Sequence, residues 1–333
     1  MIDGPVCKNP ERTGPARGDQ AITRRRFLHT TTVSLVAAPV SSLSCTLGNK
    51  SSRSRRPIRF GIVTDCHYAD TEPAGSRFYS ESLDKMSECV ALMNDEEVSF
   101  LIELGDFKDQ GKPPVEQETL VYLQDIEAVF QKFRGSTYHV LGNHDMDSIS
   151  KPQFLSQVKN TEIDRARSYY SFDVPGVHGV VLDANYRTDG IDYDHGNFDW
   201  TDANIPPEEL DWLKRDLAAA HGPAVVFIHQ RLDGAGSVYV NNAPDVRSVL
   251  ETAGDVAAVF QGHHHAGGYT NLAGIHYYTL KALVEGSGPE NSPYAIVEVL
   301  PDDRILITGY RSAVSRQLAA GSDAQDARIR CSV

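Results

Sequence analysis

The chain has 333 residues, 41% of them hydrophobic, so it is long enough for one large α/β domain or two small domains. Its 32 basic and 45 acidic side chains give a formal net charge of -13. Residues 1–45 hold six of the basic and three of the acidic groups, so residues 46–333 have 26 basic and 42 acidic groups, a net charge of -16. This acidic balance disfavours nucleic acid as a partner, because a long polyanion is repelled unless a local basic groove exists.

The N-terminal segment has the order of features that an export signal requires. Paired arginines within Thr23–Leu28 precede the uncharged, mostly small and apolar run Thr30–Val40, which is too short to span a bilayer as a stable helix. The pattern resembles a twin-arginine signal in which His29 replaces the usual Lys. We therefore expect residues 1–45 to be a signal segment for the twin-arginine export machinery, and the protein to be periplasmic or otherwise extracytoplasmic. The alternative is a disordered basic tail.

The cysteines indicate no disulfide framework, because their number is odd and none forms a CxxC pair. Cys45 is a candidate site for a lipid anchor that would hold the exported protein at the membrane, although Ser42 stands where a lipoprotein signal usually has Leu. Residues 46–57 are polar and rich in Ser and Arg, which is typical of a flexible tether before a folded domain.

From Ile58 onward, short apolar runs alternate with longer amphipathic stretches. The short runs predict strands at Ile58–Thr64, Phe100–Leu104, Tyr138–Leu141, Ala224–Ile228 and Val256–Gln261. Apolar residues at helical spacing predict helices at Glu81–Asn94, Val115–Phe133, Pro207–Ala220 and Asp245–Thr252. Three later runs, at Ile275–Leu280, Tyr294–Leu300 and Arg304–Thr308, are spaced like consecutive antiparallel strands. We expect one domain over residues 58–315 and a polar tail over 316–333.

Side chains of the types that commonly bind metal ions follow each of the first five predicted strands. The candidate donors and their neighbours are Asp65, His67, Asp106, Asn143, His144, Asp145, His229, His263 and His265. Because ligands of open α/β sheets bind beyond the carboxyl ends of the strands, we expect these loops to converge on one face. Two divalent ions that share a carboxylate and a hydroxide activate the water and clamp phosphoryl oxygens, which is the chemistry of phosphate-ester hydrolysis.

The motifs DxH, GDxxD, GNHD, a lone His after a strand and GHxH resemble, in this order, the calcineurin-like metallophosphoesterase superfamily. The resemblance covers residues 58 to about 310 and implies a four-layer αββα sandwich of two mixed β-sheets flanked by helices. It also implies two divalent metal ions, with Asp65, His67 and His265 on one, Asn143, His229 and His263 on the other, and Asp106 bridging both. Such mixed donors suit Mn, Fe or Zn better than Mg.

The resemblance further implies that a hydroxide between the ions attacks phosphorus in line, while His144 protonates the leaving oxygen or stabilises the developing charge. Asp145 is expected to hold His144 in the useful tautomer. Asp109 either orients a metal ligand or is an exposed loop carboxylate. His264 and Cys66 alternate with proposed ligands, so strand geometry predicts that they point away from the ions.

Longer strings resemble the manganese-dependent ADP-ribose/CDP-alcohol diphosphatase branch, which favours Mn as the metal. These strings are HYAD at 67–70, LGDFKD at 104–109, YHVLGNHD at 138–145, YYSF at 169–172 and VFQGHHHAGGY at 259–269. That branch often has Gln in place of His67. Residues 146–222 form a candidate specificity insertion, whose aromatics, Tyr169 and Trp200 among them, either stack on a nucleobase or fill its core. Tyr169 and Arg231 are candidate substrate contacts.

The sequence therefore predicts hydrolysis of a phosphodiester or diphosphate bond in a small, nucleotide-linked substrate. One alternative is a broad-specificity extracytoplasmic phosphomonoesterase, which would use the same ions on a small phosphate ester. The other is a non-catalytic metal-binding protein on the same scaffold. Such a protein would be expected to have lost ligand positions, and none is missing from this sequence.

Overall fold

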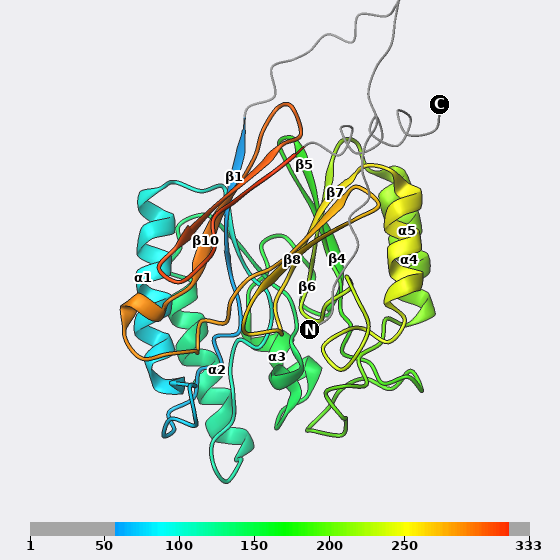
Figure 1. The fold of residues 1–333 in the computed structure, drawn as a ribbon. Helices are drawn as coiled ribbons and strands as arrows, with labels where there is room; N and C mark the ends of the chain where they lie inside the picture. The colour runs from blue at the N-terminus through cyan, green and yellow to red at the C-terminus, as the bar shows by residue number, and fades with distance from the viewer. Residues whose placement is uncertain (1–56, 320–333) are drawn as a thin grey trace, which may run out of the picture. The chain divides into compact units, whose positions relative to one another are not determined.

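Two six-stranded β-sheets form the centre of the fold (Figure 1). The computed structural model describes residues 57–319. The expected signal segment with Cys45, residues 46–56 of the tether, and residues 320–333 lie outside the described part. Residues 316–318, which were expected to begin the polar tail, form a strand of the first sheet.

The first sheet has the strand order β12-β11-β10-β1-β2-β3. Its strands are β1 (Ile58–Val63), β2 (Phe100–Glu103), β3 (Ser136–His139), β10 (Tyr294–Val299), β11 (Ile305–Tyr310) and β12 (Arg316–Leu318). β1, β2 and β3 run parallel, whereas β10, β11 and β12 extend the sheet by antiparallel pairs from the other side of β1. The carboxyl ends of β1, β2 and β3 therefore lie at one edge of the sheet.

The second sheet has the strand order β4-β5-β6-β7-β9-β8. Its strands are β4 (Tyr170–Val174), β5 (Val177–Val181), β6 (Ala224–Ile228), β7 (Val256–Gln261), β8 (Gly268–Leu272) and β9 (Ile275–Thr279). β5, β6, β7 and β9 are parallel, and antiparallel β4 and β8 close the two edges. The three late runs expected to be consecutive antiparallel strands are thus divided, because β9 joins this sheet while β10 and β11 join the first.

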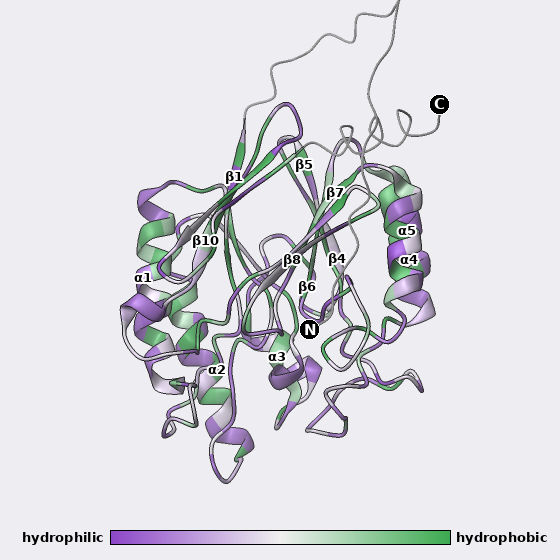
Figure 2. Cartoon of the chain, viewed as in Figure 1, coloured by the Kyte–Doolittle hydropathy of each residue, from purple (hydrophilic) through white to green (hydrophobic). Residues whose placement is uncertain are grey.

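Successive side chains of a strand point to opposite faces of its sheet, so each sheet packs against the other sheet on one face and against helices on the other. In β1, Phe60 and Ile62 point into the core between the sheets, while Val63 packs in the cluster beneath the helices. The Phe60 ring meets Phe227 of β6 edge to face, with centroids 5.7 Å apart, so the two sheets are in direct aromatic contact. Figure 2 shows hydrophobic colour along the strands and hydrophilic colour on many helix turns and loops.

Helices cover the outer face of each sheet, which confirms the predicted αββα sandwich (Figure 1). α1 (Ser82–Asp95) and α2 (Glu116–Phe130) pack on the first sheet, and α4 (Pro207–Ala219) and α5 (Ala243–Ala253) on the second. All four lie within a few residues of the helices that apolar spacing predicts. None of the helices in residues 57–319 is long and apolar enough to cross a membrane.

The segment 146–222 contributes to the common framework rather than standing outside it. It supplies β4, β5 and α4, which complete the second sheet and its helix layer, and the short α3 (Lys151–Gln157). α3 begins with a capping box, in which the Ser150 hydroxyl oxygen accepts the backbone N–H of Gln153 and Gln153 Oε1 accepts the backbone N–H of Ser150. The long loop 182–206 between β5 and α4 remains a candidate specificity segment.

Candidate metal centre

The metal-donor side chains stand on loops that follow β1, β2, β3, β6 and β7, as the sequence predicts. Backbone hydrogen bonds join the first two loops, since the N–H of Asp65 donates to the Gly105 carbonyl at 3.0 Å and that of His67 to the Asp106 carbonyl at 2.8 Å. Asp65, His67, Asp106 and His263 all have positive φ values, between 47° and 65°. Left-handed backbone at non-glycine residues costs free energy, and four of the ten such residues in the described part of the chain lie in these loops.

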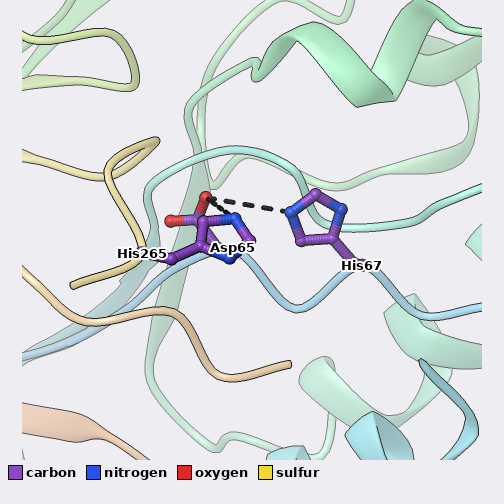
Figure 3. A group of neighbouring side chains, drawn as sticks. All are labelled: Asp65, His67 and His265. Carbon is purple, nitrogen blue, oxygen red and sulfur yellow. Dashed lines mark ion pairs between the residues drawn. The ribbon is translucent and has the colours of Figure 1, made fainter. Parts of the chain in front are cut away.

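The first donor group consists of Asp65, His67 and His265 (Figure 3). Asp65 Oδ1 lies 3.4 Å from His265 Nε2 and 3.9 Å from His67 Nε2. The other nitrogen of each ring contacts a carboxylate, because His67 Nδ1 is 3.0 Å from Asp109 Oδ2 and His265 Nδ1 is 2.5 Å from Glu285 Oε1. These partners fix the ring orientations and leave both Nε2 atoms directed at Asp65.

The second donor group consists of Asp106, His229 and His263, with Asn143 on the neighbouring loop. His229 Nδ1 lies 2.8 Å from the Leu104 carbonyl and donates to it, so Nε2 is the nitrogen that faces the other donors. That nitrogen lies 3.1 Å from Asp106 Oδ2 and 3.2 Å from His263 Nδ1. The two histidines and the aspartate therefore face one common point.

Asp106 lies between the two groups. Its Oδ2 is 3.1 Å from His229 Nε2 of the second group and 3.5 Å from His67 Nε2 of the first. Its Oδ1 accepts the backbone N–H of His144 at 2.8 Å, which holds the carboxylate in this orientation. The position is the one that a carboxylate shared by two cations must occupy.

Four buried donor atoms of the site have no hydrogen-bond partner. They are Asp65 Oδ1, His67 Nε2, Asn143 Oδ1 and His263 Nε2. A buried polar atom without a partner costs about 1–3 kcal/mol, so such a cluster is unexpected in a site built for stability alone. Divalent cations would satisfy Asp65 Oδ1, His67 Nε2 and Asn143 Oδ1, while His263 turns its Nδ1 toward the second group. The mixture of carboxylate, amide and imidazole donors fits Mn, Fe or Zn.

The charge states of Asp65, Asp106 and His263 also suit cations. Burial alone would raise the pKa of Asp65 and of Asp106, but neighbouring imidazoles, chiefly His265 and His229 respectively, hold both pKa values well below the usual range. Burial and the nearby His229 lower the pKa of His263 to about 3. These two carboxylates are therefore ionised and His263 is neutral, which are the forms that bind metal ions. Burial lowers the pKa of His229, but Asp106 outweighs burial and raises it to about 9, so this ring must lose a proton when a cation binds.

Asp147, rather than Asp145, holds the ring of His144. His144 Nδ1 lies 2.6 Å from Asp147 Oδ2, and 3.9 Å from Asp109 Oδ2. The expectation that Asp145 would hold His144 is therefore wrong, and the local backbone explains why. Residues Asn143–Met146 form a 3-10 helix, η2, and side chains three residues apart eclipse one another in such a helix. Asp147 consequently lies over His144.

Asp145 instead joins the loops that carry the ligands. Its carboxylate accepts the backbone N–H groups of Gly142 at 2.8 Å, Phe107 at 3.0 Å and Asp106 at 3.1 Å. It is fully buried. Asp145 therefore ties the loop after β2 to the loop after β3, and so fixes the position of Asp106 relative to Asn143.

Of the remaining expectations at this site, those for Asp109 and Cys66 agree with the structure, and the reasoning for His264 does not apply. Asp109 orients His67, and Cys66 is a buried core residue. His264 is half-buried in a turn after β7, so the strand alternation argued for it does not apply. Sequence reasoning missed Asp147 and Glu285. Asp147 lies just beyond the GNHD motif, three residues after His144, and Glu285 lies outside every recognisable motif.

Neither candidate substrate contact belongs to the donor groups. The guanidinium of Arg231 forms two hydrogen bonds with Asp233, at 2.9 and 2.7 Å, and stacks on the ring of Tyr239 with 4.8 Å between the Arg231 Cζ and the ring centroid. The ring of Tyr169 packs against Trp212 of α4, with centroids 5.0 Å apart. Arg231 is thus already paired, and Tyr169 contributes to packing on the helix layer.

Comparisons with known proteins agree with this geometry. A family model described as calcineurin-like phosphoesterase matches residues 58–267. The chain is 27% identical over 310 residues to a manganese-dependent ADP-ribose/CDP-alcohol diphosphatase of Oryza sativa subsp. japonica, with 80% of this chain and 95% of that protein covered. It is 24% identical over 313 residues to the protein of the same name in Bos taurus, with 77% and 92% covered.

Two solved structures share the fold. A dimetal phosphatase from Danio rerio has a TM-score of 0.67 at 20% identity, with 79% of this chain and 98% of that chain covered. A purple acid phosphatase from yellow lupin seeds has a TM-score of 0.55 at 13% identity, with 80% and 53% covered. The family model spans most of the αββα domain and all five donor loops. The chain therefore belongs to the calcineurin-like phosphoesterase family and is a hydrolase that depends on divalent metal ions.

Proposed function

We propose that the protein hydrolyses the diphosphate or phosphodiester bond of a small, nucleotide-linked substrate with two divalent cations, Mn²⁺ being favoured. The observation that carries the proposal is the place of Asp106 Oδ2 between two donor groups whose buried atoms lack partners. The substrate class is supported by the names of the relatives, which are diphosphatases of ADP-ribose and CDP-alcohols. The acidic balance agrees with a small substrate rather than a polynucleotide.

The donor groups define which residues would hold each cation. Asp65, His67 and His265 would hold one, Asn143, His229 and His263 the other, and Asp106 both. Bound cations would supply electrostatic activation of a water nucleophile and of the phosphoryl oxygens. Asp109 and Glu285 orient His67 and His265, so the donor geometry is set before a cation binds.

His144 is the residue placed to handle the leaving group. Burial disfavours charge on its ring, but the carboxylates of Asp106 and Asp147 outweigh burial and raise its pKa to about 10. Because Nδ1 is held by Asp147, Nε2 is the nitrogen left to donate a proton to the leaving oxygen. Replacing His144 with Ala should preserve bound metal and lower turnover by about 10² to 10⁴.

A substrate panel tests the proposal. Steady-state kinetics would be measured with Mn²⁺ on ADP-ribose, CDP-choline, bis-p-nitrophenyl phosphate and p-nitrophenyl phosphate. We expect the highest kcat/KM on one of the two diphosphates. A decisive preference for the monoester p-nitrophenyl phosphate would overturn the proposal and favour a phosphomonoesterase. Absence of turnover on all four substrates by protein with its full metal content would favour a non-catalytic metal-binding protein.

We also propose that residues 1–45 direct export through the twin-arginine machinery, on the support of the arginine pair and the apolar run that follows it. In a bacterial host, replacing Arg24 and Arg25 with Lys should retain the full chain in the cytoplasm. The matched control replaces Arg12 and Arg17 with Lys, which leaves the pair intact. Equal export of both variants would contradict this assignment.

Cys45 is the candidate site of a lipid anchor. Loss of fatty-acid labelling in Cys45→Ser would identify that anchor.

A further inference from the structure

Trp200 is an exposed aromatic side chain beside the metal centre. It lies on the loop 182–206 between β5 and α4, and 45% of its surface is exposed. Its ring centroid is 5.6 Å from that of His263, at an interplanar angle of 54°. An indole in water at this place is unusual, because a side chain of this size normally contributes to stability by burial.

The backbone on either side of Trp200 is held in place. Asp199 Oδ1 accepts the backbone N–H of Thr201 at 2.9 Å and the Thr201 hydroxyl at 2.8 Å. The hydroxyl of Tyr193 donates to the Asp199 carbonyl at 3.3 Å, and the buried Tyr193 ring stacks on Phe198 with 3.8 Å between centroids. The loop therefore presents the indole in a defined position, which lowers the entropy cost of binding a ligand against it.

The charges around Trp200 restrict what binds there. Asp199 and Asp202 flank it in sequence, and the Asp202 carboxylate contacts Thr188 and Asn241 on the same rim. These carboxylates would repel a further phosphate. An uncharged, flat group fits the exposed face of the indole, because aromatic rings stack on one another with favourable dispersion and little desolvation cost.

We propose that Trp200 is the platform on which the nucleobase of the substrate stacks while the phosphates lie at the donor groups. The inference rests on the proposed function and adds the orientation of the substrate within the site. The contact between Trp200 and His263 places the platform directly beside a proposed metal ligand, so a ribosyl group is a suitable bridge between base and phosphate. Trp200 is in this view a specificity-determining residue rather than a catalytic one.

Two ligands that differ only by the base test this inference. AMP and ribose 5-phosphate would be measured as competitive inhibitors of Mn²⁺-loaded wild type, Trp200→Ala and Trp200→Phe. Loss of stacking should raise the AMP inhibition constant of Trp200→Ala about 5- to 100-fold, whereas Trp200→Phe stays close to wild type. Ribose 5-phosphate should inhibit all three equally. Equal effects on both ligands, or none on AMP, would overturn the inference.

Fluorescence gives an independent measurement that needs no turnover. The chain has two tryptophans, so Trp212→Phe leaves Trp200 as the sole reporter. AMP should quench this emission in the Mn²⁺-loaded variant, and ribose 5-phosphate should not. Quenching without hydrolysis of any diphosphate or phosphodiester would contradict the proposed function and leave the stacking role of Trp200 intact. Diphosphate hydrolysis without quenching would do the reverse.

Discussion

Adding a single methyl group at Gly142 should displace the shared carboxylate. A Cβ at this position would lie 2.1 Å from the Asp106 backbone nitrogen and 2.3 Å from Asp106 Oδ1, while real contacts essentially never fall below 3.0 Å. The loops must therefore separate by at least about 0.9 Å. Gly142 has a φ of -101°, which Ala adopts freely, so the effect is steric. A displacement of about 1 Å in a catalytic site costs about 10²-fold in rate.

The assay combines metal content with kinetics. For Gly142→Ala we expect kcat/KM on the best substrate to fall about 10²-fold or more, with less bound Mn²⁺ per folded chain. Gly111→Ala is the matched control on the loop after β2, because its Cβ would meet no heavy atom closer than 3.5 Å. If Gly142→Ala kept wild-type metal content and kinetics, the close approach of Gly142 to Asp106 would have no role in the site.

Three further outcomes are expected. Asp147→Asn should lower kcat about 10- to 100-fold with metal content unchanged, since it loosens His144, and a wild-type kcat would remove Asp147 from this role. Asp145→Asn should lower the melting temperature, because its carboxylate joins two loops, and an unchanged melting temperature would contradict that. Hydrogen bonds to Asp216 and Asp173 raise the pKa of His178 in the folded protein. These bonds therefore stabilise the fold fully at pH values below the pKa of His178 in the unfolded chain, and their contribution is lost as the pH rises through its pKa in the folded protein. By urea unfolding, His178→Gln should therefore lose about 1 kcal/mol more at about pH 5.5 than at about pH 9, and an equal loss would refute this.

The donor loops were predictable because their signals are local. Each of β1, β2, β3, β6 and β7 is a short apolar run, and a ligand-type residue follows within a few positions. Parallel strands bring such loops to one edge of a sheet, so residues as distant as Asp65 and His263 meet without any long-range information. The backbone N–H of His263 donates to Asp65 Oδ2 at 3.1 Å, although 198 residues separate them.

Strand partners and two ring-orienting residues, Glu285 and Asp147, were not predictable in the same way, whereas the GDxxD motif had indicated Asp109. β9 and β10 are both apolar runs, and only tertiary packing places one in each sheet. Glu285 reaches His265 from a loop 20 residues away with no motif around it. The choice of Asp147 over Asp145 depends on the 3-10 geometry of η2, which the GNHD motif does not reveal. Local patterns thus indicate the ligands better than the groups that orient them.

Anomalous diffraction from a crystal of the Mn²⁺-loaded protein tests the shared role of Asp106 most directly. We expect two Mn²⁺ peaks, one beside Asp65 and His265 and one beside Asn143 and His229, with Asp106 in contact with both. A single peak at full Mn²⁺ loading, or two peaks of which only one contacts Asp106, would contradict that shared role.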